Sequence, residues 1–145
     1  MSKLDKEAPE APIFFLDECL GGEKVAEVLT RAGLIVELHK RHFTPGTPDK
    51  DWLPVIGERG WVLLTQDKAI KRRPLEILVL RQYRVSAFVV SAKGLRGEEI
   101  GALIEASIPK ILRILKKTLP PLVASISRGS VVELQEGTPK YPRKK

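Results

Sequence analysis

The sequence predicts an α/β fold, a parallel sheet with helices on both faces, from three observations. Short apolar runs of strand length, such as Ile13–Leu16 and Trp61–Leu64, end abruptly in polar residues. Segments with apolar residues at spacings of three and four, typical of amphipathic helices, come between such runs. Strand and helix alternate four times, as the crossover connections between parallel strands require. A length of 145 residues suits one hydrophobic core, so we expect one domain.

The first half of the chain is predicted to hold two strands and two helices. Residues 1–12 are polar and of mixed charge, and we expect a disordered lead-in there. Gly33 follows the first helical pattern and is a natural C-terminal cap. The predicted order is a strand over Ile13–Leu16, a helix through Val25–Ala32, a strand over Leu34–Leu38, a loop over His39–Pro48 and a short helix through Trp52–Ile56.

The second half is predicted to end in a hairpin that closes the sheet. Pro74 is expected to open a helix, because the first helical nitrogen has no partner to lose. Pro109 is expected to kink or split the longest helix. The predicted order is a strand over Trp61–Leu64, a helix from Pro74 to Leu80, a strand over Ser86–Val90, a helix over Gly97–Lys117, a hairpin of Val123–Ile126 with Val131–Leu134, and a basic tail over residues 136–145.

Composition and charge limit the classes of function to be considered for this protein. The formal net charge is +7 and the sequence pI is about 9.7, which favours a polyanionic partner, most often nucleic acid. No apolar run approaches the ~20 residues of a membrane-spanning helix. The polar N-terminus does not resemble a signal peptide, and the single cysteine, Cys19, cannot form an internal disulfide. We therefore expect a cytoplasmic protein, with Cys19 as a small buried apolar side chain.

Acidic residues follow the predicted strands at one edge of the sheet. Asp17 and Asp67 come at the carboxyl ends of two buried strands, Glu18 adjoins Asp17, and Asp49 and Asp51 follow the second strand. The carboxyl ends of parallel strands share one edge, where such sheets bind ligands. Clustered carboxylates repel one another unless a cation lies among them, and oxygen ligands suit Mg²⁺ or Mn²⁺. Such ions can activate a water molecule for attack on a phosphodiester.

Each acid also has a simpler interpretation. Asp is common after strands because its side chain suits turns. Asp51 stands three residues before Pro54 and would serve as the N-cap of the short helix. Glu18 would then point to solvent. The joint pattern favours Asp17 and Asp67 as metal ligands, ahead of Asp49, with Glu18 and Asp51 behind.

Three motifs give the chain a resemblance to a known family. Phe14–Leu20 is similar to the "LLDENL" opening of PIN-like domains related to toxin-type ribonucleases. Thr47–Leu53 resembles their "SDEEIL" helix start, and Trp61–Lys68 resembles their "VLVTRDK" strand and turn. Order and spacing agree over roughly residues 13 to 118, and together the motifs are moderately specific.

The resemblance implies a PIN-like domain over residues 13–135 and a metal-dependent endoribonuclease that hydrolyses single-stranded RNA. It implies Asp17, Asp49 and Asp67 as the acids that hold Mg²⁺ or Mn²⁺. It also implies that the protein is the toxin of a toxin–antitoxin pair, with an antitoxin protein as its partner. One departure stands out: Ala69 occupies a position where many relatives carry a further aspartate, which leaves a fourth ligand unassigned.

Basic and aromatic residues supply the remaining candidates. Lys68, Lys71, Arg72 and Arg73 come directly after Asp67 and are expected to contact RNA phosphates. His39 and His42 lack a third ligand, so a zinc site is not expected; an RNA backbone contact or no role at all remains. Trp52 and Trp61 could stack on nucleic-acid bases, but packing in the core is the stronger expectation for both.

Two other classes of protein stay open. A catalytically inactive PIN-like module that binds RNA or protein would account for Ala69. A receiver-type phosphoacceptor domain would also place acids after its first and third strands, with Ser91 and Lys93 nearby, but receivers carry that lysine after the fifth strand. The RNA target, the metal used and the choice between monomer and homodimer are not determined by the sequence.

Overall fold

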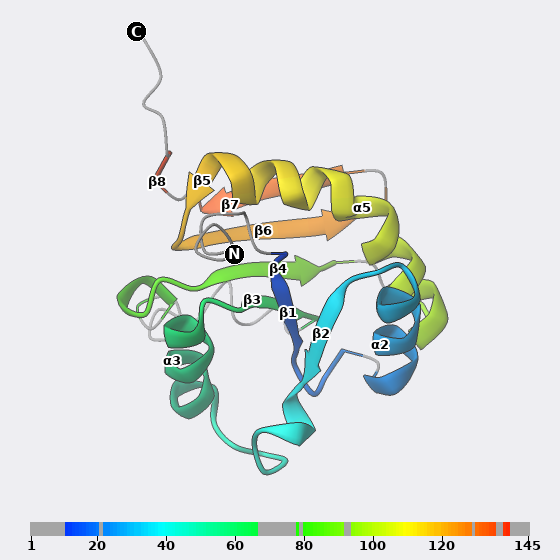
Figure 1. The fold of residues 1–145 in the computed structure, drawn as a ribbon, viewed down its shortest axis with the longest axis horizontal. Helices are drawn as coiled ribbons and strands as arrows, with labels where there is room; N and C mark the ends of the chain where they lie inside the picture. The colour runs from blue at the N-terminus through cyan, green and yellow to red at the C-terminus, as the bar shows by residue number, and fades with distance from the viewer. Residues whose placement is uncertain are drawn as a thin grey trace, which may run out of the picture.

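A six-stranded sheet forms the centre of the fold in the computed structural model, which describes residues 11–20, 22–66, 78, 80–91, 94–128, 130–135 and 138–139 (Figure 1). The strand order is β2-β1-β3-β4-β6-β7; the first five strands are parallel and β7 pairs antiparallel with β6. The strands are β1 (Ile13–Leu16), β2 (Ile35–Leu38), β3 (Val62–Thr65), β4 (Ser86–Val90), β6 (Leu122–Ser127) and β7 (Ser130–Gln135). The predicted α/β fold with a closing hairpin is therefore confirmed.

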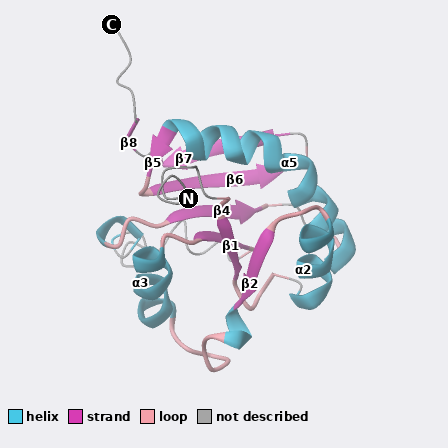
Figure 2. Ribbon diagram, viewed as in Figure 1, coloured by secondary structure: helices cyan, strands magenta, loops and turns pink. Residues whose placement is uncertain are grey.

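Helices lie on both faces of the sheet (Figure 2). They are α2 (Gly22–Arg31), the short 3-10 helix η1 (His39–Arg41), α3 (Asp49–Arg59) and α5 (Gly97–Lys117). A separate pair of two-residue strands, β5 (Thr118–Leu119) and β8 (Thr138–Pro139), joins antiparallel. No helix in the described part of the chain is long and apolar enough to cross a membrane.

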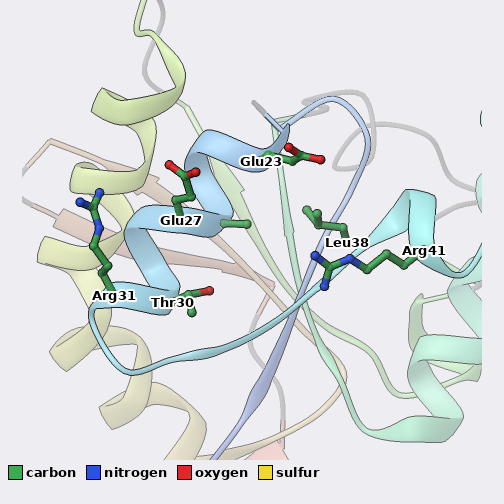
Figure 3. Close-up of a pocket in the computed structure, with 7 residues that line it drawn as sticks. Glu23, Glu27, Thr30, Arg31, Leu38 and Arg41 are labelled. Carbon is green, nitrogen blue, oxygen red and sulfur yellow. The ribbon is translucent and has the colours of Figure 1, made fainter.

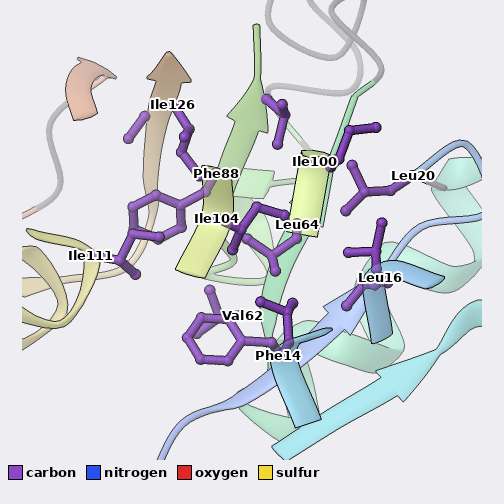
Figure 4. Close-up of a cluster of buried hydrophobic side chains, with 14 of the residues drawn as sticks. Phe14, Leu16, Leu20, Val62, Leu64, Phe88, Ile100, Ile104, Ile111 and Ile126 are labelled. Atoms are coloured by element: carbon purple, nitrogen blue, oxygen red, sulfur yellow. The ribbon is translucent and has the colours of Figure 1, made fainter. Parts of the chain in front are cut away.

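The sheet divides the core into two clusters, because successive strand residues point to opposite faces. Phe14 of β1 and Phe88 of β4 pack beneath α2 and α5 (Figure 4). Phe15 of β1 packs on the other face, with Trp52 and Ile56 of α3. Both faces are covered, which explains why the strands read as continuous apolar runs rather than as alternating ones.

The longest predicted helix agrees with the structure at both ends. Helix α5 spans Gly97–Lys117 and carries acids in its first turn and lysines in its last, both favourable to the helix dipole. The Glu99 side chain accepts a hydrogen bond of 2.7 Å from the Arg96 amide, which completes a capping box. Pro109 lies inside one continuous helix, so the split is wrong, but Figure 1 shows the helix axis turning part-way along.

The cap expected for the short helix is wrong. Helix α3 begins at Asp49, and Pro48 is its N-cap. Pro48 has the extended conformation of an N-cap (φ −60°, ψ 146°), and its carbonyl accepts a hydrogen bond of 2.9 Å from the Asp51 amide. Asp51 is therefore a first-turn acid, where it favours the dipole, and Pro54 lies inside the helix.

Two other predictions meet the structure only in part. The stretch predicted as a loop contains η1. Strand β8 lies within residues 136–145, the predicted tail, and pairs with β5.

Two further predictions fall largely on residues that the structure does not describe. Pro74 and most of the helix predicted after it lie outside the described residues, although Leu78 and residues 80–82 are helical. The lead-in before Ala11 lies outside them too, so the domain boundaries stay predictions.

Candidate active site

Asp17 forms a tight turn where β1 ends. Its amide donates a 3.1 Å hydrogen bond to the Leu64 carbonyl, which continues the ladder between β1 and β3. Its Oδ1 accepts from the Cys19 amide at 2.9 Å, and its carbonyl accepts from the Leu20 amide at 3.1 Å. A side-chain oxygen that bonds an amide two residues on is the local geometry for which Asp is favoured in turns. The turn-forming interpretation is therefore correct for Asp17.

A turn does not explain the burial of this carboxylate. Asp17 is only 7% exposed, and its Oδ2 accepts a 2.6 Å hydrogen bond from Oγ1 of Thr65, which is fully buried. Parallel pairing of β1 with β3 places the two side chains together, because Leu16 is in register with Leu64. Within the described residues, no ion pair involves Asp17. Burying a charged carboxylate is costly unless its oxygens are paired, and hard oxygens of this kind suit Mg²⁺ or Mn²⁺.

Cys19 lies beside this carboxylate and does not have the buried position expected of it. The residue is exposed, and its Sγ lies 3.5 Å from Oγ1 of Thr65. Partial burial of the sulfur and then the negative charge of Asp17 raise the pKa of the Cys19 thiol to about 11. Cys19 is therefore a neutral thiol at physiological pH and a poor nucleophile.

The other predicted acids are distributed around this centre. Glu18 turns towards the loop before α3, where its Oε1 and Oε2 accept from the Gly46 amide at 3.2 and 3.4 Å. Asp49 is the half-buried first residue of α3, and Asp51, two residues further in the same first turn, is exposed. Within the described part of the chain, no three His, Cys, Asp or Glu side chains form a group able to hold a metal. The positions predicted to complete the site lie outside it: Asp67, Lys68, Lys71, Arg72 and Arg73.

The two histidines and two tryptophans have structural surroundings. His39 is 2% exposed among aromatic rings, 6.0 Å from Phe15 and 5.6 Å from Trp52 between centroids, so it cannot contact RNA. His42 bonds the Glu37 carboxylate at 2.8 Å. Trp52 is 1% exposed in the core, as predicted. Trp61 is half-buried and stacks on Phe15.

Thr65 is a candidate site residue that sequence reasoning did not single out. It stands at the end of a buried apolar run, where a hydroxyl needs a hydrogen-bond partner. That requirement, combined with the pairing of β1 and β3, is the signal that identifies it. Ser91 follows β4, the next strand, and its Oγ lies 2.5 Å from Oγ of Ser125. Polar side chains thus end three neighbouring strands, β1, β3 and β4.

A hollow of about 690 Å³ lies beside α2, between that helix, the end of β2 and η1 (Figure 3). Its charged side chains are mixed in sign: Glu23, Glu27, Arg31 and Arg41. A hydrogen bond from Lys40 lowers the pKa of Glu23, which it meets at 2.5 Å. A lining of mixed sign gives this hollow no preference for a polyanion.

The parallel sheet and the buried acid at its carboxyl edge define an α/β domain with a candidate ligand site at that edge. The family model described as "PIN like domain" matches residues 12–92, more than half of the chain. The chain therefore belongs to the PIN-like domain family, as its three motifs predicted.

A curated relative agrees with this assignment. The chain is 25% identical over 103 residues to the protein named "Putative ribonuclease VapC45" of Mycobacterium tuberculosis (strain ATCC 25618 / H37Rv). The match covers 68% of this chain and 75% of the relative. No solved structure gave a significant match.

Proposed function

We propose that the protein is a metal-dependent endoribonuclease that cuts single-stranded RNA in the cytoplasm. One observation carries the proposal: a buried carboxylate, Asp17, is held by two hydrogen bonds at the carboxyl edge of a parallel sheet in a PIN-like domain. Sheets of this kind bind their ligands at that edge. Membership of the family and the mycobacterial relative, which is named as a ribonuclease, both support a nuclease.

The metal ligands in this proposal are Asp17, Asp49 and Asp67, with Glu18 and Asp51 as further candidates. Mg²⁺ or Mn²⁺ bound there would supply an activated water and stabilise charge on the phosphodiester. The chain itself orients the carboxylate of Asp17, because the Thr65 hydroxyl donates to one oxygen and the Cys19 amide to the other. Groups that bond a metal ligand in this way fix its direction and tune its affinity.

RNA would be held by the basic residues that follow Asp67 in the sequence, namely Lys68, Lys71, Arg72 and Arg73. The net charge of +7 favours the encounter with a polyanion. The resemblance of its motifs to those of toxin-type ribonucleases supports a toxin role, with an antitoxin protein as partner. Homodimerisation is compatible with the proposal and is not required by it.

An inactive PIN-like module that binds RNA or protein is the second candidate. One observation favours it: Ala69 replaces an acid of many relatives. It predicts RNA binding that does not depend on metal. Family membership leaves no support for a receiver domain.

Cleavage of end-labelled single-stranded RNA with Mn²⁺ or Mg²⁺ tests the proposal. Wild type should cut only with metal, and both Asp17→Asn and Asp67→Asn should lose activity by at least a hundredfold. Glu105→Gln, an exposed acid on α5, is the matched control and should cut like wild type. RNA bound but never cut, with or without metal, would establish the inactive module. Cutting that survives both substitutions would place the reaction elsewhere.

A further inference from the structure

An apolar groove of about 840 Å³ lies where the first three strands of the sheet begin. The segments before β1 and β2 form one wall, and the second half of α5 forms the other. Its apolar lining includes Pro12, Leu34, Ile35, Leu112 and Leu115. Ile35 is 44% exposed and Leu112 is 38% exposed, both high for large apolar side chains. Adjacent exposed apolar side chains in a concave surface mark an interaction site.

The geometry of α5 explains why the groove is open. Near its start, Gly101 lets α5 approach Val28 of α2 so closely that a Cβ at Gly101 would lie 2.7 Å from the Val28 Cβ. Pro109 of α5 lines the groove. The axis of α5 turns part-way along the helix (Figure 1). The second half of α5 then runs over β6 instead of continuing along α2. The wall that carries Leu112 is left without a facing helix among the described elements.

The rim of the groove is positively charged. Arg113 and Lys116 line it and are exposed, and no acidic side chain lines it among the residues that the structure describes. No described residue forms an ion pair with either cation, whereas Lys24 pairs with Glu98 and Lys40 with Glu23. An apolar floor with two exposed cations at its edge is complementary to an amphipathic segment whose polar face is acidic.

We propose that this groove binds an acidic amphipathic helix of a partner protein. The apolar side chains of that helix would pack on Ile35 and Leu112, and its carboxylates would pair with Arg113 and Lys116. A second copy of this chain would bring the same basic rim and a net charge of +7, and is disfavoured. The groove lies at the edge of the sheet opposite Asp17, so the inference stands independently of nuclease activity.

Binding of a designed fluorescent peptide tests the inference. The probe is a helix of about 16 residues, with leucines at i, i+3, i+4 and i+7 and glutamates on the other face. A second probe carries lysines in place of the glutamates. Wild type should bind the acidic probe at least tenfold more tightly than the basic one. Leu112→Asp should weaken binding of the acidic probe at least tenfold. The melting temperature of this variant is measured to show that the fold persists.

Charge-reversal variants distinguish binding at the groove from a general effect of the protein's net charge. Arg113→Glu/Lys116→Glu should invert the preference, so that the basic probe binds more tightly. Arg31→Glu/Arg41→Glu changes the net charge equally, at exposed residues that do not line the groove, and should retain the acidic preference. Equal effects of the two double variants would overturn the inference. So would a concentration-dependent dimer that Leu112→Asp dissociates, because a second copy would then cover the groove.

Discussion

Asp17 has two hydrogen-bonding roles that the sequence alone cannot distinguish. Its Oδ1 closes the turn that ends β1, and its Oδ2 accepts the hydroxyl of Thr65 from the neighbouring strand. A solvated turn aspartate would have only the first role. Burial to 7% exposure makes the second one energetically important, because an unsatisfied buried carboxylate is costly. The local motif thus identifies the residue, while its chemistry depends on a residue 48 positions away.

Removing the hydroxyl of Thr65 should therefore affect both stability and metal binding. Thr65→Val keeps the side-chain shape but leaves one carboxylate oxygen without its donor, at a cost of about 1–3 kcal/mol. Loss of an orienting group of this kind typically weakens a metal site about 10- to 100-fold. Urea unfolding in EDTA measures the first effect, and Mn²⁺ titration by calorimetry measures the second. Thr65→Ser retains the donor and should stay near wild type; a matching loss in Thr65→Ser would show that the methyl group, not the hydroxyl, matters.

The thiol of Cys19 reports the charge of the same site. Its pKa is raised to about 11, so between pH 9 and 11 the folded protein keeps a proton that the unfolded chain releases. This contribution to stability is complete below pH 9 and is lost as the pH rises through about 11. Iodoacetamide alkylation in EDTA should show a midpoint near pH 11 when folded and near pH 9 in urea. Asp17→Asn should lower the folded midpoint, whereas Glu105→Gln should not; an unchanged midpoint in Asp17→Asn would contradict the assigned cause.

At the scale of elements, the sequence predicts best where one physical effect dominates. Strands β1 and β4 match their predicted bounds because both faces are buried and the apolar runs are continuous. Helix α5 matches at both ends because acids and lysines mark its termini. The N-cap at Asp51 failed because Pro48, with its fixed φ, already supplied the extended residue that starts α3.

Contacts between segments that are distant in the sequence could not be predicted from local patterns. The Glu18 carboxylate bonds the Gly46 amide 28 residues away, and no local pattern distinguishes this from a solvated acid or a metal ligand. The pairing of β5 with β8 involves only two residues on each side, too few to form a periodic pattern. Such features depend on the assembled sheet, which brings these segments together.

Gly101 tests whether packing outweighs helix propensity. Propensity alone predicts that Gly101→Ala stabilises α5 by about 1 kcal/mol. The added methyl would lie 2.7 Å from the Val28 Cβ, a contact that must push α2 and α5 apart, so we expect a loss of about 1–3 kcal/mol instead. Chemical denaturation gives the sign directly. Val28→Ala should restore part of the loss in the double variant, because it removes both methyl groups of Val28; a stabilised Gly101→Ala would show that the helices adjust freely.

At the scale of the whole molecule, the parallel sheet separates two kinds of surface. All strands from β1 to β4 end at one edge, where Asp17, Thr65 and Ser91 lie. The same strands begin at the opposite edge, where the apolar groove and its basic rim lie. Under the two proposals, RNA chemistry and partner binding occupy different edges. The net charge of +7 alone would not distinguish them, so the position of the charges has to be tested.

The salt dependence of RNA binding makes that distinction. Each phosphate contact with single-stranded RNA contributes about −0.7 to the slope of log K against log salt concentration. Replacing Lys71, Arg72 and Arg73 with Gln should therefore flatten the slope by about 2, if these side chains hold the strand. Replacing Arg113, Lys116 and Lys117 with Gln removes the same charge at the end of α5 and should leave the slope nearly unchanged. Fluorescence anisotropy with labelled RNA measures the salt slope of both variants, and EDTA prevents metal-dependent cleavage during the titration. Equal flattening in the two variants would mean that net charge, rather than the basic segment after Asp67, recruits RNA, and the proposed path of the strand across the carboxyl edge would then be wrong.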